Sequence, residues 1–496
     1  MILFSTLGFV VFYVLGRLLY NVYFHPLCRY PGPKLWAATR IPYTQSMVTG
    51  RLHRRVLELH QEYGPIVRIG PDELAYNDSK AWRDLHGHVK GQTGDHGRDP
   101  VATWDYRHGI IGAKREDHPR FRRGLTHGFS AQAMKEQQPI VTGYVDLFIQ
   151  RLHQSCASGS RPLDMVKWYD FVTFDILGDL AFGESFNCLQ GSEYHSWVKI
   201  IFDNVKASAI GIEARRFPAV ARLLEYLVPA HLIEQQKHHN ALTHHKRLAA
   251  KGERPDFMHS MLRKRENKTE FTLPELESTS STIIMAGSET TSTALAGITY
   301  FLVTHPEVMK KLCNEVRASF ATEDEINMNS VQSLRYMYAI INEGMRMFPP
   351  VATGIPRKVF EGGGVFLDRF VPEGTLVQVW HWSVYHSPGN FAFPDSFVPE
   401  RWLDEDARFA NDRKEAFQPF SIGPRSCIGM NLAYAEMRLI LARVIWNFDI
   451  KLHPDSRGWF EGMKTYILWQ KDPLQVYLTP RKVGDGSRTF QSPPDM

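Results

Sequence analysis

The sequence predicts a mainly α-helical fold with small β-sheets, preceded by a single N-terminal transmembrane helix. Three observations lead to this prediction: an apolar stretch at residues 2–23, a long helical segment that begins near residue 272, and short strand-like segments at 351–359, 362–368 and 374–380. Glycine and proline separate the strand-like segments. Because helical and strand segments do not alternate along the chain, a parallel sheet built from βα units is not expected.

The N-terminal stretch (ILFSTLGFVVFYVLGRLLYNVY) is expected to anchor the chain in a membrane. As a helix it rises about 33 Å, which is enough to cross a hydrocarbon core of about 30 Å. Arg17 lies near one end, where its head group can reach the interface. Seven basic residues precede the first acidic residue, Glu58, so the positive-inside rule places the rest of the chain in the cytosol. A cleaved signal peptide is the alternative, but the stretch lacks a basic n-region and an A-x-A-like site.

The chain is expected to divide into a membrane anchor at residues 1–24, a proline-rich hinge at 25–38, one large domain at 39–483 and a flexible tail at 484–496. The hinge carries three prolines in its first eleven residues, and proline favours stiff, non-helical chain. Length alone suggests about three domains. No internal repeat or low-complexity linker divides the central part, however, so we expect one domain there.

Composition restricts the class of protein. The 496 residues are 43% hydrophobic and carry a net charge of +5, which is typical of a globular protein and does not indicate a nucleic-acid partner. Five scattered cysteines include no C-x-x-C pair, which argues against a zinc ribbon or an iron–sulfur cluster. Such a set indicates reduced thiols on the cytosolic side of the membrane.

The longest predicted helix begins at Thr272-Leu-Pro-Glu275, which is a capping box with proline in the first turn. No proline follows until Pro306, so we expect a helix of some 30 residues. Ten of the sixteen residues at 278–293 are Ser or Thr, which are mediocre helix formers, so we expect this part to be buried against something flat and large. Thr304 is expected to cap the next helix, and an amphipathic helix is expected at 334–347.

The segment Phe420-Ser-Ile-Gly423-Pro-Arg425-Ser-Cys427-Ile-Gly429 fits the pattern F-x-x-G-x-R-x-C-x-G. Chance would produce such a match in about one chain in ten thousand. The cysteine lies in a glycine-bounded loop that we expect to open a helix at residue 428. Backbone N–H groups at a helix N-terminus donate hydrogen bonds to a thiolate and lower its pKa, which suits an axial ligand of haem iron. A buried structural cysteine is the alternative.

With this motif the chain resembles the cytochrome P-450 family of haem-thiolate monooxygenases, from the anchor to about residue 480. Glu343-Gly-Met-Arg346 fits the family's E-x-x-R, and Pro399-Glu-Arg401-Trp fits its P-E-R-F/W. E-x-x-R is a weak signal alone, because it recurs at 213–216 and 405–408, but only the copy at 343 lies on a strongly predicted helix. Ala286-Gly-Ser-Glu-Thr-Thr matches the family's A/G-G-x-D/E-T-T/S in the middle of the long helix.

The resemblance implies a role for each matched residue. It makes Cys427 the iron ligand, and it makes Glu343, Arg346 and Arg401 a buried cluster that locks the haem pocket. Glu289 and Thr290 would relay protons through water. The residues that would contact the haem are Ala286, Gly287, Phe420, Gly423 and Gly429, and the propionate partners would be His118, Arg122, Arg357 and Arg425. His118 replaces the Trp that the family usually has in W-x-x-x-R.

The function that the resemblance implies is insertion of one oxygen atom of O₂ into an apolar small molecule, by hydroxylation or epoxidation. The cofactor would be haem b. The chain lacks a flavin or nicotinamide fingerprint, so its electrons would come from NADPH through a separate NADPH-dependent cytochrome reductase. The enzyme would be single-pass in the endoplasmic reticulum membrane, with its catalytic domain in the cytosol. The chain looks most similar to fungal secondary-metabolite hydroxylases such as those of the trichothecene pathway.

Two other functions stay open: a haem-thiolate isomerase or dehydratase, and a non-catalytic haem-binding protein. The intact Glu289-Thr290 pair argues against the first. The substrate is not readable from the sequence, although family position places the pocket wall at 101–111, 208–212 and 351–355. The histidines at 238, 239, 244 and 245 are expected to form a solvated helix face rather than a metal site.

Overall fold

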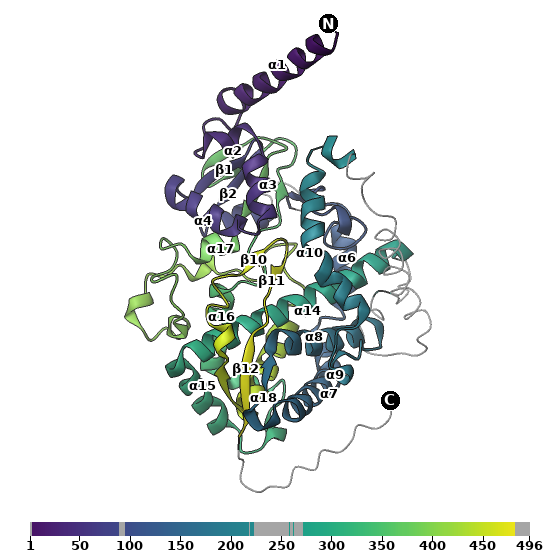
Figure 1. Cartoon of the computed structure of the whole chain (residues 1–496), viewed down its shortest axis with the longest axis vertical. Coiled ribbons are helices and arrows are strands. Elements are labelled where there is room, and N and C mark those ends of the chain that lie inside the picture. The colour runs from purple at the N-terminus through teal and green to yellow at the C-terminus, as the bar shows by residue number, and fades with distance from the viewer. Residues whose placement is uncertain are drawn as a thin grey trace.

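The structure is a computed structural model that describes residues 2–88, 95–217, 219–222, 257, 261 and 271–481. The expected tail and the histidine cluster at 238–245 lie outside the described residues. Helices dominate the described part, with small sheets beside them, as the sequence predicts (Figure 1). The α-helices are α1 (Ile2–Tyr23), α2 (Lys34–Ala38), α3 (Ile41–Val48), α4 (Leu52–Tyr63), α5 (Ala81–His86), α6 (His118–Thr126), α7 (Ala131–Ser155), α8 (Met165–Phe182), α9 (Cys188–Gly191), α10 (Ser196–Ala214), α14 (Leu273–Thr304), α15 (Pro306–Ser319), α16 (Arg335–Met347), α17 (His381–Tyr385) and α18 (Met430–Asn447).

The described strands form two larger sheets and two pairs, β6 with β7 and β10 with β11. A five-stranded sheet with the order β1-β2-β8-β5-β3 lies near α1, and a three-stranded sheet with the order β4-β12-β9 lies at the opposite end (Figure 1). In the larger sheet β2 and β8 pair in parallel and the other neighbours are antiparallel. The strands are β1 (Ile66–Gly70), β2 (Glu73–Tyr76), β3 (Gly97–Arg98), β4 (Pro162–Asp164), β5 (Arg357–Lys358), β6 (Gly364–Phe366), β7 (Arg369–Val371), β8 (Leu376–Val379), β9 (Phe448–Leu452), β10 (Lys464–Thr465), β11 (Trp469–Gln470) and β12 (Gln475–Pro480).

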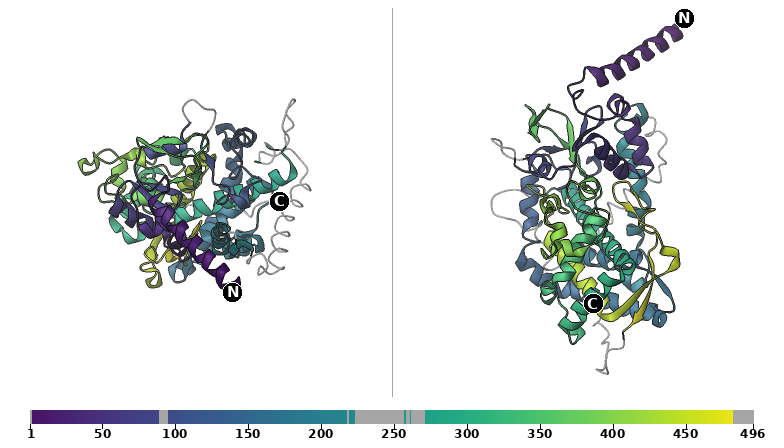
Figure 2. Two further views of the ribbon diagram at one scale, coloured as in Figure 1. Left: turned by 90° about the horizontal axis from the view of Figure 1, so that it is seen from above. Right: turned by 90° about the vertical axis from the view of Figure 1, so that its left-hand side faces the viewer.

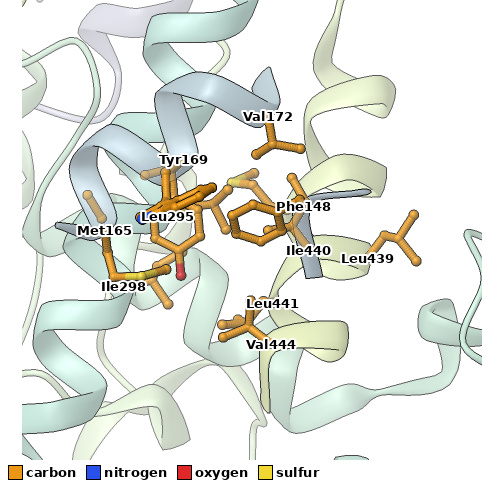
Figure 3. Packing of buried hydrophobic residues seen from close by; sticks show 14 of the residues in the cluster. Phe148, Met165, Tyr169, Val172, Leu295, Ile298, Leu439, Ile440, Leu441 and Val444 are labelled. Atoms are coloured by element: carbon orange, nitrogen blue, oxygen red, sulfur yellow. The ribbon is translucent and has the colours of Figure 1, made fainter. Parts of the chain in front are cut away.

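The largest hydrophobic core lies among four helices, α7, α8, α14 and α18. Figure 3 shows Phe148 of α7, Tyr169 of α8, Leu295 of α14 and Ile440 of α18 converging, and each is at most 1% exposed. Most of α8 is buried on all sides, which is why its sequence shows little amphipathic alternation. Burial of such side chains stabilises the fold by about 1.5–3 kcal/mol each. This core holds α14 across the middle of the molecule.

The long helix α14 begins and ends close to its predicted limits. Both hydrogen bonds of the capping box at Thr272 are present. The hydroxyl-rich segment is buried mainly against α8: Ser288 Oγ donates to the Thr173 carbonyl over 3.1 Å. Other hydroxyls bond within the helix, as when Thr282 Oγ1 donates to the Ser278 carbonyl over 2.7 Å. The Ser and Thr residues are therefore tolerated because α8 and the helix's own carbonyls satisfy them.

Several predicted helix ends differ from the structure. Thr304 does not cap α15, because its hydroxyl donates to the Tyr300 carbonyl and the N-cap residue is His305, which makes no side-chain cap bond. The helix after the cysteine loop begins at Met430 rather than at residue 428. In the proline-rich hinge, Lys34–Ala38 forms the short helix α2 after Pro33, so the hinge is not wholly extended. Proline is compatible with the start of a helix, which the prediction overlooked.

The helix α1 projects from the rest of the molecule (Figure 1 and the right-hand view of Figure 2). Among the described residues it is the one helix long and apolar enough to cross a membrane, over Phe4–Tyr23 with a mean hydropathy of 1.4. At its base the Asn21 side-chain amide donates to the Ala38 carbonyl over 2.9 Å. This bond joins the apolar helix to α2 and thus to the globular part.

Candidate functional site

The predicted cysteine loop immediately precedes α18. The Cys427 amide donates to the Phe420 carbonyl over 2.8 Å, which closes the loop, and the Cys427 side chain is exposed. The surrounding protein nevertheless removes enough bulk water to raise the pKa of the Cys427 thiol, while the Gly429 N–H and the Arg122 charge act in the opposite direction. The N–H group at the start of α18 therefore acts on the pKa in the expected direction, but burial outweighs it. An accessible cysteine sulfur in such an environment is suited to bind a metal ion as a soft ligand.

The backbone conformation and close packing at position 423 require glycine. It has φ of +78°, and a Cβ there would lie 1.9 Å from the His86 carbonyl oxygen. Any other residue would force the loop away from the end of α5, so glycine at this position fixes how the cysteine loop packs. Gly429 is less confined, since a Cβ there would lie 4.0 Å from the Cys427 sulfur.

Two of the predicted propionate partners, Arg357 and Arg425, meet at one carboxylate. Arg357 Nη1 donates to Asp95 Oδ2 over 2.9 Å, and Arg425 Nε donates to the same oxygen over 2.7 Å. All three side chains are at most 4% exposed. Burial lowers the pKa of Arg357 to about 10, Asp95 opposes this shift, and the Arg425 charge adds to it.

Arg98, on β3, belongs to the same cluster. Burial lowers its pKa well below the usual value, and the charges of Arg357 and Arg425 add to this effect. Four buried nitrogens in the cluster have no hydrogen-bond partner among the described residues: Arg98 Nε and Nη1, Arg357 Nε and Arg425 Nη2. Arg357 and Arg425 thus share the carboxylate of Asp95, and the Arg98 guanidinium lies near them. Unpaired buried donors are costly, and this set fits a ligand that brings further carboxylates. The two propionates of haem meet that requirement.

His118 and Arg122 lie on α6, next to this cluster and the cysteine loop. Burial, helped by the charges of Arg425 and Arg98, lowers the pKa of His118 to about 3, so its imidazole is neutral. Arg122 Nη1 donates to the Ser426 carbonyl over 2.6 Å, and its Nη2 donates to Ser426 Oγ over 3.2 Å. In this arrangement Arg122 braces the backbone immediately before Cys427. Its predicted propionate contact stays a prediction.

Glu343, Arg346 and Arg401 come together as predicted and are at most 1% exposed. Arg346 makes a bidentate pair with Glu343, with both N–O distances 2.9 Å, and Arg401 Nε donates to Glu343 Oε1 over 3.1 Å. The Val398 amide and the Trp402 indole also donate to this carboxylate, over 2.9 and 3.0 Å. The cluster joins α16 to the 3₁₀ helix at Pro399–Trp402.

Both arginines of this cluster also donate hydrogen bonds to backbone carbonyls of neighbouring segments. Arg346 Nη1 donates to the Tyr385 carbonyl over 2.9 Å, and Arg401 Nη2 donates to the Ala392 carbonyl over 3.0 Å. Arg401 also pairs with Asp412. Burial alone would raise the pKa of Glu343, but Arg346 and Arg401 outweigh it and lower this pKa. The carboxylate is therefore ionised and satisfied at neutral pH.

On α14 the predicted site residues face different neighbours. Thr290 Oγ1 donates to the Ala286 carbonyl over 2.6 Å, so these two share one face. A Cβ on Gly287 would lie 2.9 Å from Leu177 Cδ1, so the missing side chain makes room for α8. The predicted haem contact of Gly287 stays a prediction. Residues 286 and 287 point about 100° apart around the helix. The motif alone does not say which neighbour each of them faces.

Glu289 lies on the α8 side of α14 and is 1% exposed. Its Oε1 accepts hydrogen bonds from Lys471 Nζ over 2.9 Å and from Thr293 Oγ1 over 3.2 Å. Burial raises the pKa of Glu289 to about 7, with Lys471 lowering it and Asp170 raising it. Such a carboxyl can both hold and release a proton near neutral pH.

Sequence reasoning missed Asp95, Arg98, Asp170 and Lys471. Asp95 and Arg98 lie in an irregular segment with a two-residue strand, and no motif marks them. Lys471 lies between β11 and β12, far from α14 in the sequence. Only the folded chain places it beside Glu289. A buried lysine cannot be told from a surface lysine by its sequence context.

The comparisons with known proteins agree with this site. A family model described as Cytochrome P450 matches residues 31–478. Trichothecene C-15 hydroxylase of Fusarium sporotrichioides is 47% identical over 95% of this chain and 96% of its own. Cytochrome P450 monooxygenase astA of Talaromyces wortmannii is 43% identical over 93% and 94%. Averantin hydroxylase of Dothistroma septosporum is 41% identical over 96% and 91%.

A helical fold with an accessible cysteine near a buried guanidinium cluster fits the haem-thiolate class of protein. The chain belongs to the cytochrome P450 family. It is a haem-dependent monooxygenase of the kind found in fungal secondary-metabolite biosynthesis, and it uses O₂ and electrons that a reductase supplies. This favours the predicted monooxygenase over the isomerase and the non-catalytic carrier. The apolar helix α1 indicates a membrane-anchored protein.

Proposed function

We propose that Cys427 is the haem ligand and that Arg98, Arg357, Arg425 and His118 hold the haem propionates. The observation that carries this proposal is the set of four buried, unpartnered guanidinium nitrogens around Asp95. Phe420, Gly423 and Gly429 shape the loop that presents the sulfur, and Arg122 braces it through Ser426. When bound, haem supplies the iron at which O₂ is activated for insertion into a C–H or C=C bond.

The proton path that we propose runs along α14. Glu289 Oε2 is buried and has no hydrogen-bond partner among the described residues, so it is the oxygen free to carry a proton. Thr290 Oγ1, on the next residue, donates to the Ala286 carbonyl and can also accept from a water. A proton can therefore pass from Glu289 through water to Thr290 during O₂ activation.

The substrate that we propose is an apolar small molecule of fungal secondary metabolism, which the enzyme hydroxylates or epoxidises. The predicted wall at 101–111 lies against the N-terminal half of α14. There the Tyr106 hydroxyl donates to Met285 Sδ over 3.7 Å, and a Cβ on Gly109 would lie 2.8 Å from Ser278 Oγ. This segment therefore contacts α14 one residue before Ala286, which supports its place in the substrate pocket. The relatives named for trichothecene and averantin hydroxylation make a trichothecene and averantin the first substrates to test.

The location that we propose is the endoplasmic reticulum membrane, with residues 1–24 as a single-pass anchor, 25–38 as a hinge and 39–483 as the cytosolic catalytic domain. The apolar and exposed surface of α1 supports this arrangement. The proposed electron donor is a separate NADPH-dependent cytochrome reductase in the same membrane. A reconstituted mixture of this chain and such a reductase should consume NADPH and O₂ with a bound substrate, whereas an isomerase would consume neither.

Replacing one member of the guanidinium cluster tests where haem is held. The Arg425→Met enzyme should lose much of its haem, because it lacks one of the positive charges proposed to pair with the propionate carboxylates. Arg335→Met is the matched control, since the Arg335 side chain is 74% exposed. Haem content per polypeptide and the ferrous–carbon monoxide spectrum give the result. Equal haem retention in the two variants would contradict the placement of the propionates.

A further inference from the structure

A buried lysine lies between two buried carboxylates at the side of α14. The Lys471 side chain is 3% exposed, and its ammonium lies 2.9 Å from Glu289 Oε1 and 3.5 Å from Asp170 Oδ1. Lys471 belongs to the segment between β11 and β12, Asp170 to α8 and Glu289 to α14. Three elements that are remote in sequence thus meet at one cation.

Hydroxyl groups complete this contact. Lys471 Nζ also donates to Thr293 Oγ1 over 2.9 Å and to Ser292 Oγ over 3.3 Å. Ser292 Oγ in turn donates to Asp170 Oδ1 over 2.5 Å, and the Tyr194 hydroxyl donates to Asp170 Oδ2 over 2.8 Å. Asp170 is therefore satisfied on both oxygens. Its bonds fix the position of Lys471 rather than leave it free to move.

The two oxygens of Glu289 differ in this arrangement. Oε1 accepts from Lys471 and Thr293, whereas Oε2 is buried without a partner among the described residues. A carboxyl held at one oxygen cannot rotate without breaking two hydrogen bonds. The proton of the neutral form is consequently confined to Oε2, because Oε1 already faces an ammonium group.

The charge balance keeps this proton exchangeable. One ammonium faces two carboxylates in a site closed to bulk water, so the cluster holds one negative charge more than it can pair. Burial raises the pKa of Glu289 to about 7, Lys471 lowers it, and Asp170 raises it. Burial would lower the pKa of Lys471, but Asp170 and Glu289 outweigh it and raise this pKa, so the ammonium stays charged.

We propose that Lys471 is a positioning residue for proton delivery: it holds Oε1 of Glu289 so that Oε2 alone takes up and releases the proton, while Asp170 holds Lys471 in place. This inference rests on the proposed proton path through Glu289 and Thr290. Lys471 does not touch the reacting atoms. It acts by orienting Glu289 and by setting the pH at which Glu289 is protonated.

The test is the ratio of product formed to NADPH consumed, measured against pH in the full-length enzyme with a reductase and a substrate that it turns over. In the parent this ratio should fall as the pH rises through about 7, because the neutral form of Glu289 is lost. Lys471→Met removes a cation that stabilises ionised Glu289. In the Lys471→Met enzyme the fall in product per NADPH should therefore move to higher pH by about one unit or more. The maximum ratio should drop several-fold, because the carboxyl is no longer oriented.

Asp170→Asn makes the opposite change with little loss of volume. It removes an anion that raises the pKa of Glu289, so the fall in coupling should move to lower pH. This second variant keeps the test decisive if Lys471→Met does not fold, as judged by its ferrous–carbon monoxide spectrum. Lys471→Arg should restore the parent profile in part, since it keeps the charge. Lys451→Met is the matched control, because Lys451 is an exposed lysine on β9 and should leave the profile unchanged.

A combined variant separates this inference from the proposed function. In a Glu289→Gln background, Lys471→Met should cause no further loss of coupling, because Lys471 acts through Glu289. If Glu289→Gln is itself as coupled as the parent, the proposed proton path fails. If Glu289→Gln is uncoupled but Lys471→Met and Asp170→Asn both keep the parent pH profile, the role of Lys471 is overturned alone. Additive losses in the combined variant would also overturn it.

Discussion

At the scale of single residues, a motif predicts the identity of some site residues, whereas the neighbours of others depend on packing alone. Cys427 and Gly423 are predictable, because a thiolate ligand and a left-handed turn each restrict the residue type. The neighbours of Gly287 and Arg122 are not predictable, since a motif gives spacing along the helix but not the direction of a neighbour. Their neighbours in the structure, Leu177 and Ser426, come from segments remote in sequence.

Thr290→Ala tests the proposed proton path at the residue where it leaves α14. The variant should keep its haem and its ferrous–carbon monoxide spectrum, because Thr290 lies on α14, away from the loop that carries Cys427. NADPH oxidation should continue while reduced oxygen leaves as hydrogen peroxide. A positioned proton donor contributes about 10²–10⁴-fold, so product per NADPH should fall sharply.

Loss of packing could mimic that result, because alanine is smaller than threonine. Thr290→Ser keeps the hydroxyl and drops only the methyl group, so it should largely restore coupling. Product and peroxide are measured together in both variants. A fully coupled Thr290→Ala enzyme would show that the hydroxyl has no part in proton delivery.

At the scale of elements, the sequence predicts where helices exist better than where they end. The limits of α14 follow from a capping box and a proline, both of which are local signals. The N-cap of α15 was missed because the Thr304 hydroxyl bonds within the preceding turn. The helix α18 begins two residues later than expected. The pairing of β6 with β7 was missed as well, because the predicted segment at 362–368 ends before β7 begins at Arg369.

The Glu343 cluster is the element-scale feature most open to test. Glu343→Gln leaves Arg346 and Arg401 buried without their shared anion. Breaking a buried pair from one side costs about 3–5 kcal/mol. Thermal unfolding of the haem-loaded enzyme should therefore occur at a lower temperature, with loss of haem. Because the folded pKa of Glu343 lies below the usual 4.5, its contribution is complete above that pH and is lost as the pH falls through the lower value.

Glu405→Gln is the matched control for this prediction. Glu405 begins another E-x-x-R copy in the sequence, but its side chain is 68% exposed and lies 3.5 Å from an exposed Arg335. Exposed pairs contribute about 0–1 kcal/mol, so the melting temperature should hardly change. If the two variants melt alike, the cluster at Glu343 does not lock the fold.

At the scale of the whole molecule, the predicted combination of one apolar helix and a helical body is present in the structure. The four-helix core and the sheets do not involve α1, whose side chains are mostly exposed. What the sequence could not supply is the long-range arrangement, such as the meeting of Asp95 with two arginines more than 250 positions later. Residue types alone do not say which charges become neighbours.

Removal of residues 1–24 tests the independence of the body from the anchor. Much of the truncated protein should move from the membrane to the soluble fraction with its haem retained, because the core packs without α1. Fractionation and the ferrous–carbon monoxide spectrum give the two readouts. Complete loss of haem would indicate that the N-terminal helix belongs to the fold.

The central claim is that Cys427 is the thiolate ligand of haem iron, and one spectrum tests it most directly. Cys427→Ser replaces a thiol by a hydroxyl that does not ionise near neutral pH, so the electron donation from sulfur is lost. The reduced, carbon monoxide-bound variant should lack the red-shifted absorption of the parent and should not turn over. A Cys427→Ser protein that keeps the red-shifted band would contradict the assignment of the ligand.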